Sequence, residues 1–257
     1  MNERELRRHA TIQKMVERRN NLAASAASVK REQKESMDFI IKMYERGRIN
    51  YAELKEKCEF NLINTDEVDV SIIIPVMGRE NFNKPLVEHL LKAMDFLKEK
   101  TYSITFVEHS EEPSHKMLCK GKTNHIWIKK TNKDFFNKCL AMNIGAFFSN
   151  KAKYYLFHDI DLLVKKDFFH NIFENLSKSN TSALQAFSGR RVIVISKELT
   201  DLILTHKLKI DDFEPGGILA PYSAAGAPGG SIFINREGFY KIGGFDAELF
   251  HSYSCED

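Results

Sequence analysis

The sequence predicts an α/β fold, in which a mostly parallel sheet is flanked by helices and preceded by a helical arm. The first observation is the β-branched run Val70-Ser71-Ile72-Ile73-Ile74-Pro75, which is typical of a strand buried on both faces of a parallel sheet. The second is that, from this run onward, short apolar runs alternate with segments of helical period, as in successive strand–helix units. A hydrophobic content of 43% is enough for a sizeable core.

Residues 1–60 are expected to form a basic helical arm. They are rich in Arg, Glu, Lys, Gln and Ala and contain neither Pro nor Gly before Gly47, as helices prefer. Up to residue 48 they hold twelve Lys or Arg against seven Asp or Glu, so positive charges exceed negative ones by five. This local excess is larger than the net charge of +3 of the whole chain. A solvated helical hairpin or packing arm is the favoured interpretation. A basic face that contacts an anionic membrane or a glycolipid is the alternative.

Residues 61–257 are expected to form the core domain. After a polar connector at 61–69, strands are predicted at 70–75, 102–108, 125–129, 154–163, 183–187, 191–195 and 231–235. Helices are predicted at 84–98, 134–149, 166–177, 197–207 and 236–242, the last of which ends at Gly243. Small and Gly-rich residues between 216 and 230 predict loops that can approach a ligand closely.

Two carboxylates follow the most apolar part of the strand predicted at 154–163. Because side chains alternate along a strand, Asp159 and Asp161 are expected to point one way and Ile160 the other. Two like charges so close repel each other unless a cation or several donors lie between them. Carboxylate oxygens suit a hard divalent ion such as Mg²⁺ or Mn²⁺, which is often shared with substrate phosphates. A turn or a helix cap would also explain two such Asp residues.

Charged residues also follow two other predicted strands. Arg79 lies shortly after the strand at 70–75, and Glu108 ends the strand at 102–108. Because ligands of parallel sheets bind beyond the carboxyl ends of the strands, Arg79, Glu108 and the two Asp residues are expected to converge on one crevice. For Glu108, an ordinary ion pair is an equal alternative.

The composition excludes several classes of function. A net charge of +3 is too small to predict a nucleic-acid partner. The four cysteines form no C-x-x-C pair, which favours free thiols over a disulfide framework or a zinc site. No apolar run is long enough for a membrane-spanning helix, and charges from Glu3 onward leave no signal peptide. We therefore expect a cytoplasmic protein, whose only membrane association would be peripheral, at the inner face.

The motifs from Val70 to Asp257 resemble, in their order, those of a GT-A-type (Rossmann-like) nucleotide-sugar glycosyltransferase. The likeness is greatest to the β-1,4-galactosyltransferase family and related bacterial capsule and polysaccharide enzymes. Residues 70–79 are similar to that family's first strand and its Pro-Phe-Arg-Asn-Arg nucleotide loop, of which Pro75 and Arg79 are kept. Two further segments resemble the donor side of the family. Phe136-Asn137-Lys138 is similar to its Phe-Asn-Arg, and Asn143-Ile144-Gly145 to its Asn-Val-Gly. His158-Asp159-Ile160-Asp161 is similar to its metal-binding Asp-Val-Asp.

The acceptor-side block of the family also has counterparts. Gly229-Gly230-Ser231, Asn235, Phe239 and Gly243-Gly244-Phe245 look like its Gly-Gly and Asn-Gly-Phe segments. The final residues 253–257 are similar to Trp-Gly-Gly-Glu-Asp, with the Trp and both Gly replaced. The chain stops on two acids, and we expect the GT-A domain to continue in a longer enzyme.

The resemblance implies inverting, metal-dependent transfer of a hexose or N-acetylhexosamine from a UDP-sugar to a hydroxyl of a saccharide or glycolipid. Asp161, with Asp159 beside it, would hold Mn²⁺ or Mg²⁺. Asp257 would be the general base, and Glu256 would orient the acceptor hydroxyls. A retaining GT-A transferase remains an alternative, as does a non-catalytic sugar-nucleotide-binding or scaffold domain of a larger polysaccharide synthase.

By the same resemblance, the donor nucleotide is expected to contact residues at strand ends and Gly-rich loops. These are Pro75, Val76, Arg79, Glu108, Phe136, Lys138, Asp159, Ala227, Gly229 and Gly230. Arg79 and Lys138 would neutralise phosphate charge, and Phe136 would pack on the uracil or donor, or else belong to the core. Ala227 stands where the family has a bulky aromatic that crowds the donor's C2 substituent. UDP-GalNAc or UDP-GlcNAc is therefore expected to be accepted at least as well as UDP-Gal.

The family's further metal ligand, a His, has no counterpart up to Asp257. His158 and His251 are the alternatives within the chain, although an ordinary structural role is the simpler expectation for both.

Overall fold

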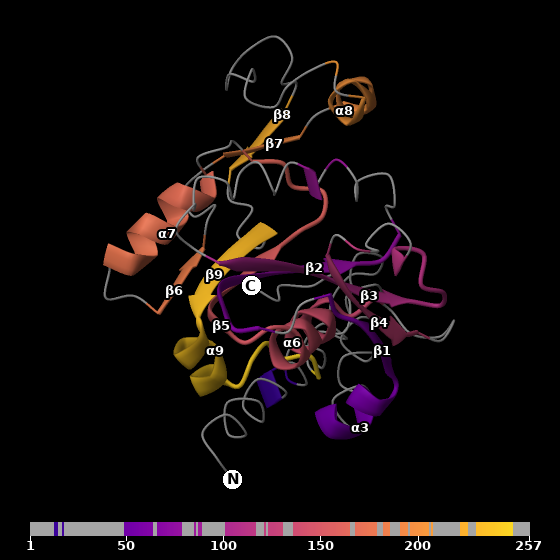
Figure 1. Ribbon diagram of the computed structural model, residues 1–257. Coiled ribbons are helices and arrows are strands. Elements are labelled where there is room, and N and C mark those ends of the chain that lie inside the picture. The colour runs from indigo at the N-terminus through magenta and orange to yellow at the C-terminus, as the bar shows by residue number, and fades with distance from the viewer. Residues whose placement is uncertain are drawn as a thin grey trace.

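A seven-stranded sheet with helices on both faces forms the centre of the chain in the computed structural model (Figure 1). The structure describes residues 13–14, 17, 49–63, 66–78, 85, 87–88, 101–116, 121, 123–130, 136–164, 168–178, 182–185, 191–194, 196–205, 207, 222–225 and 230–248. Of the predicted arm before residue 49, only Gln13, Lys14 and Glu17 belong to these ranges, and all three are helical and exposed.

The strands of the sheet lie in the order β1-β4-β3-β2-β5-β9-β6. Their bounds are β1 Cys58–Asn61, β2 Val68–Val76, β3 Tyr102–Ser110, β4 Asn124–Lys129, β5 Ala152–His158, β6 Ala183–Gln185 and β9 Ser231–Asn235. Strands β4, β3, β2 and β5 are parallel neighbours, whereas β1 and β9 run antiparallel to the strands beside them. The predicted α/β class with a mostly parallel sheet is confirmed.

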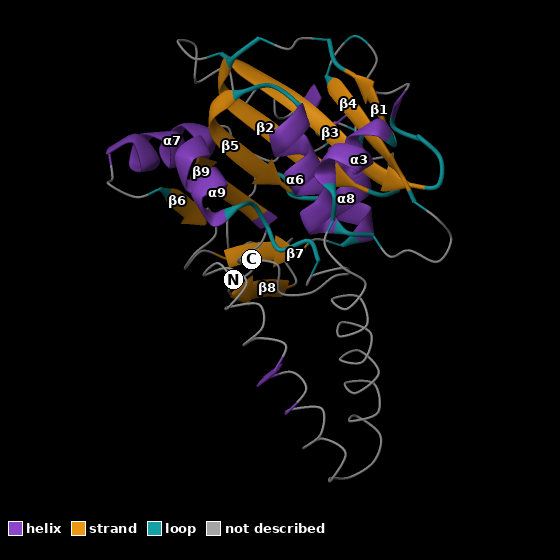
Figure 2. Ribbon diagram, turned by 90° about the horizontal axis from the view of Figure 1, so that it is seen from below, coloured by secondary structure: helices purple, strands orange, loops and turns teal. Residues whose placement is uncertain are grey.

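Helices cover both faces of this sheet. On one face, a buried cluster includes side chains of β2, Val87 and the aromatic side of α7 (Phe168–Lys178). On the other face, α6 (Lys138–Phe148) packs on β2, α9 (Arg236–Ile242) packs on β5 and β9, and α3 (Tyr51–Glu56) packs on α6. Figure 2 shows the sheet from the side of these last three helices. Strand β2 is consequently buried on both faces, as its continuous β-branched sequence predicts.

Two strands lie where the sequence predicts none. Cys58–Asn61, expected as the end of the helical arm and the start of the connector, forms β1 and pairs antiparallel with β4, so that the boundary expected at residues 60/61 falls inside a strand. Tyr222–Ala225, expected as loop, forms β8, which pairs with β7 (Arg191–Val194) in a separate two-stranded sheet. In both segments the strand is set by a partner distant in sequence, which local pattern does not reveal.

Of the helix predicted at 84–98, only residues 85, 87 and 88 belong to the described ranges, and all three are helical. Apart from the strand predicted at 154–163, the other predicted elements are found with small shifts of their ends. Helix α8 spans Lys197–Leu204, and α9 begins after the cap Asn235 and ends at Gly243, whose φ of 76° is the left-handed value expected of a C-terminal glycine. Within the described residues, no helix is long and apolar enough to cross a membrane.

Helix α6 approaches β2 unusually closely at Gly145. A Cβ at this position would lie 2.5 Å from Ile73 Cγ2 and 3.0 Å from Val107 Cγ2. Both neighbours are fully buried, so neither can move away without disturbing the core. Glycine at residue 145 therefore sets the distance between helix and sheet.

We expect Gly145→Ala to lower the free energy of unfolding by about 1–3 kcal/mol, because the added methyl overpacks the core. In an open helical position the same change would stabilise by up to about 1 kcal/mol. Urea unfolding measures the sign directly, and an unchanged or raised stability would contradict the close packing.

Candidate active site

Parallel pairing brings the ends of β2, β3 and β5 to one edge of the sheet. Val76 pairs with Glu108 in the adjacent strand, and Ile73 pairs with Phe157 on the other side. Strand β9 runs the opposite way and begins here, because Ser231 pairs with His158. The predicted convergence of strand ends is therefore met for the described residues.

The two candidate metal ligands lie in a turn, not in a strand. Strand β5 ends at His158, which corrects the expectation that it continues to residue 163. The Asp159 backbone N–H donates to Gly230 O at 2.9 Å, and its carbonyl accepts from Leu162 N at 3.2 Å. Ile160 is buried at 4% exposure, while Asp159 is half-buried and Asp161 exposed. The separation of Ile160 from the acids is thus produced by the turn, and not by strand alternation.

His158 is tied into the fold by both ring nitrogens. Nδ1 lies 3.1 Å from Ser231 Oγ and Nε2 lies 2.9 Å from Leu162 O. The side chain is almost fully buried. These contacts are those of a histidine that holds the acidic turn against β9, which is the structural role expected for it.

Lys138 forms an ion pair with Asp159. Its Nζ lies 3.1 Å from Oδ1 and 3.3 Å from Oδ2 of the carboxylate. Lys138 is the first residue of α6, and the side chains of the pair retain 11% and 30% exposure. The pair is open to solvent mainly on the Asp159 side, because Lys138 as a whole residue is buried.

The donor atoms at this turn fit a hard divalent cation. The described residues contain no group of three or more His, Cys, Asp or Glu that could hold a metal. Asp159 and Asp161 nevertheless supply carboxylate oxygens at the strand-end edge, and Asp161 is exposed. Ions such as Mg²⁺ are commonly held by one or two carboxylates, with waters and substrate phosphates as the other ligands.

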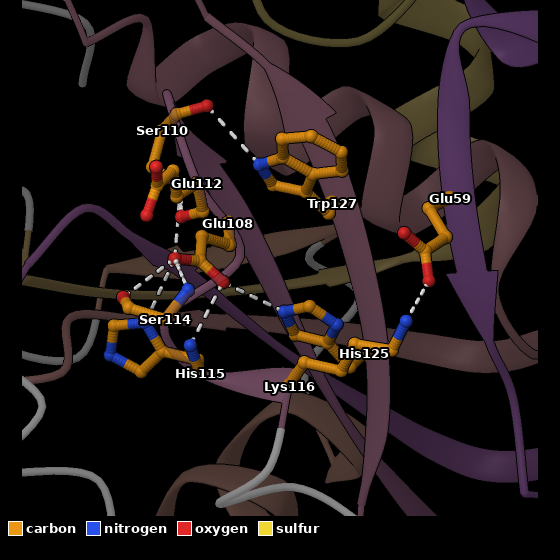
Figure 3. A network of polar contacts seen from close by, with 9 residues as sticks. All are labelled: Glu59, Glu108, Ser110, Glu112, Ser114, His115, Lys116, His125 and Trp127. Carbon is orange, nitrogen blue, oxygen red and sulfur yellow. Dashed lines mark hydrogen bonds and ion pairs between the residues drawn. The ribbon is translucent and has the colours of Figure 1, made fainter.

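Glu108 is enclosed by hydrogen-bond donors (Figure 3). Its Oε1 accepts from Ser110 Oγ at 2.9 Å, from Ser114 N at 2.9 Å and from Ser114 Oγ at 2.8 Å. Its Oε2 accepts from His115 N at 3.1 Å and from His125 Nε2 at 2.9 Å. Since an ionised carboxylate only accepts, His125 presents its Nε2–H here. Both carboxylate oxygens of Glu108 are thus satisfied by hydrogen bonds from within the protein.

The same contacts determine the charge of Glu108. Burial alone would raise the pKa of this carboxyl, because it disfavours the charged form. Hydrogen bonds from His115, His125 and Ser114 stabilise the carboxylate and outweigh that effect, so the pKa lies far below its ordinary value. Glu108 is therefore ionised throughout the neutral range although it has no exposed surface.

The other predicted site residues divide into two groups. The first group lies in described residues at or near the strand-end edge. Pro75 and Val76 end β2 and are buried, and Gly230 precedes β9 beside Asp159. Phe136 is buried, with its ring centroid 6.2 Å from that of His109. Outside the described residues lie Arg79, Ala227, Gly229, His251, Glu256 and Asp257.

Asn137 has a structural role that its motif alone does not explain. Its Oδ1 accepts from Leu140 N at 2.8 Å and so caps α6, while its own N–H donates to His109 Nδ1 at 3.1 Å. An Asn immediately before an apolar helical segment is a signal for an N-cap. The cap fixes where α6 begins, and hence where Lys138 stands.

Comparison with known proteins finds solved glycosyltransferase structures. The catalytic domain of Drosophila β1,4-galactosyltransferase 7 in complex with xylobiose is 17% identical, with a TM-score of 0.40 over 74% of this chain and 57% of that one. A mutant of this enzyme with manganese, UDP-Gal and xylobiose is 16% identical, with a TM-score of 0.38 over 69% of this chain and 52% of that one.

A third similar structure is the mannosyltransferase PcManGT from Pyrobaculum calidifontis, in complex with GDP-Man and Mn²⁺. It is 13% identical, with a TM-score of 0.44 over 81% of this chain and 55% of that one. The chain thus spans little more than half the length of these proteins. No protein-family model and no curated protein sequence matches it.

We expect Glu108→Gln to lower the free energy of unfolding at neutral pH by about 1–3 kcal/mol, because buried donors lose their charged acceptor. The depressed pKa means that this stabilisation is fully present above the unfolded-state pKa of about 4.3 and is lost as the pH falls through the folded pKa. The deficit of the variant should therefore shrink below about pH 4. Urea unfolding across pH measures it, with the exposed Glu112→Gln as the matched control. Equal deficits in the two variants would contradict this account.

Proposed function

We propose that the chain is a metal-dependent, inverting glycosyltransferase, which transfers a hexose or N-acetylhexosamine from a UDP-sugar to a saccharide or glycolipid hydroxyl. The observation that carries the proposal is the partly exposed Lys138–Asp159 pair at the strand-end edge, beside Gly230. Lys138 opens α6 and Asp159 follows β5, the next element along the chain, so that the pair joins two consecutive elements. Their juxtaposition with the exposed Asp161 creates a site that can receive a cation and a phosphate together.

Each charged residue has a separate role in this proposal. Lys138, with Arg79, binds the diphosphate, and its ion pair with Asp159 is exchanged for the substrate. Asp161, with Asp159 beside it, would hold Mn²⁺ or Mg²⁺. A bound divalent ion supplies a Lewis acid that offsets the negative charge of the departing diphosphate. The buried, ionised Glu108 anchors the loop that follows β3 and so supports this edge of the sheet.

The acceptor side of the proposal rests on the resemblance of the final residues. Asp257 would remove the proton from the attacking hydroxyl, and Glu256 would orient the acceptor. By the same resemblance, Ala227 would leave room for an N-acetyl group, so UDP-GalNAc or UDP-GlcNAc is expected to be used at least as well as UDP-Gal. Acceptors displayed at the inner face of a membrane fit the basic arm.

We expect release of UDP from at least one of UDP-Gal, UDP-Glc, UDP-GalNAc and UDP-GlcNAc, dependent on Mn²⁺ and abolished by chelator. Asp161→Ala should lower the rate by about 100-fold, since several kcal/mol of charge stabilisation depend on the ion. The exposed Asp201→Ala on α8 is the matched control and should leave the rate unchanged.

Each other outcome of this assay has a definite meaning. Metal-dependent UDP binding without turnover would support the non-catalytic binding domain instead. Turnover of GDP-mannose alone would refute the UDP-sugar assignment, and a product of retained anomeric configuration would refute the inverting mechanism. Absence of any nucleotide binding would refute the proposal as a whole.

Lys138→Met should weaken UDP binding by about tenfold or more, because a charge-assisted contact to phosphate is lost while the aliphatic stem is kept. The matched control is Lys153→Met, which removes a lysine that pairs with Asp69 at 2.7 Å at the opposite end of β5. Calorimetric titration with UDP and Mn²⁺ compares the two. Equal affinities for UDP would exclude Lys138 from the phosphate site.

A further inference from the structure

The segment Phe245–Glu248, which follows α9, is held along α6 by two asparagine side chains. Asn143 is fully buried and pairs with both backbone groups of Phe245: its Nδ2 donates to Phe245 O and its Oδ1 accepts from Phe245 N, each at 2.9 Å. A side-chain amide that bonds the N–H and the C=O of one residue imitates a strand neighbour and restricts that residue to one position.

Asn137 makes the second attachment. While its Oδ1 caps α6, its Nδ2 donates to Ala247 O at 2.9 Å. The two halves of one amide therefore serve two segments that are 110 residues apart in sequence. Because Asn137 immediately precedes Lys138, the segment is attached next to the residue that pairs with Asp159.

The local sequence is adapted to this attachment. Gly244 has a φ of +78°, and a Cβ there would lie 2.6 Å from Asn143 Oδ1. Any other residue would be both strained and in collision with the amide. The Phe245 ring packs edge-on against Phe157 of β5, with centroids 4.9 Å apart. Glycine and phenylalanine in the Gly243-Gly244-Phe245 run are thus explained by contact with α6 and β5.

Two residues at or just before the start of α3 join the same network, Tyr51 through Asn143 and Ile49 through Glu248. Tyr51 OH accepts from Asn143 Nδ2 at 2.7 Å, and Ile49 N donates to Glu248 Oε1 at 3.3 Å. Asn143 therefore joins Tyr51, in the last part of the predicted arm, to Phe245, in the segment that precedes Glu256 and Asp257 in sequence.

We infer that Asn137 and Asn143 are positioning residues, which hold Phe245–Glu248 in register with the Lys138–Asp159 pair and so couple the acceptor side of the site to the donor side. This inference rests on the proposed function, because the coupling has a role only where a donor binds near Lys138. Neither asparagine is assigned a contact with substrate. Both act through the segment that they hold.

The test is hydrogen–deuterium exchange of the full chain, with and without UDP and Mn²⁺. The amides to follow are Phe245, which donates to Asn143, and Ala247, which donates to Phe245 O at 3.0 Å. In the unmodified chain, UDP with Mn²⁺ is expected to slow their exchange by about fivefold, the size of one net hydrogen bond.

Asn137→Ser separates the two functions of Asn137. Serine caps helices as well as asparagine does, but it is too short to reach Ala247 and has no amide to donate. This variant should bind UDP with an affinity within about twofold of the unmodified chain, since the cap is kept, yet should lose the slowing of exchange. Asn50→Ser makes the same change at the cap of α3 and should behave as the unmodified chain.

The outcomes distinguish the inference from the proposed function. If the unmodified chain binds UDP without any change in exchange at Phe245 and Ala247, or if Asn137→Ser retains the slowing, the coupling is refuted while the transferase proposal stands. If the unmodified chain does not bind UDP with Mn²⁺, the proposed function is refuted, and the inference falls with it.

Discussion

Burial of β2 on both faces is the constraint on which the rest of the structure depends. An apolar strand of nine residues has to be flanked by strands and covered by helices on both sides. The neighbours β3 and β5 are parallel to it, so their carboxyl ends meet at one edge together with the end of β2. Every described polar group of the candidate site is attached to that edge or to the helix that begins beside it. The hydrophobic core thereby decides where chemistry can take place.

Helix α6 connects the core to the site. Gly145 brings it close to β2, the Asn137 cap fixes its first turn, and Lys138 then stands beside Asp159. The same helix holds the segment after α9 through Asn143. Packing at one end of the helix and hydrogen bonding at the other are therefore not independent, because a shift of the helix along the sheet would disturb both.

Two acidic positions show how environment separates residues of the same chemistry. Glu108 is deeply buried and meets enough donors to remain charged, which makes it part of the framework. Asp159 pairs with Lys138 and remains partly exposed, and Asp161 is exposed. Only the latter two can give up water or an ion pair for a ligand without the large desolvation cost of a buried charge.

The sequence by itself determined the fold class, most strands and helices, and the place of two acids near the end of a buried strand, because hydrophobic periodicity and capping residues act locally. It also predicted that Glu108 and the Asp159/Asp161 pair lie at one edge, since parallel strands leave little choice. Only the tertiary structure decided that β5 stops at His158, that β1 and β8 are strands, and that Lys138 reaches Asp159. It likewise decided that Asn143 meets Phe245, 102 residues further along. These features depend on partners distant in sequence, whose distance is set by packing and leaves no local pattern.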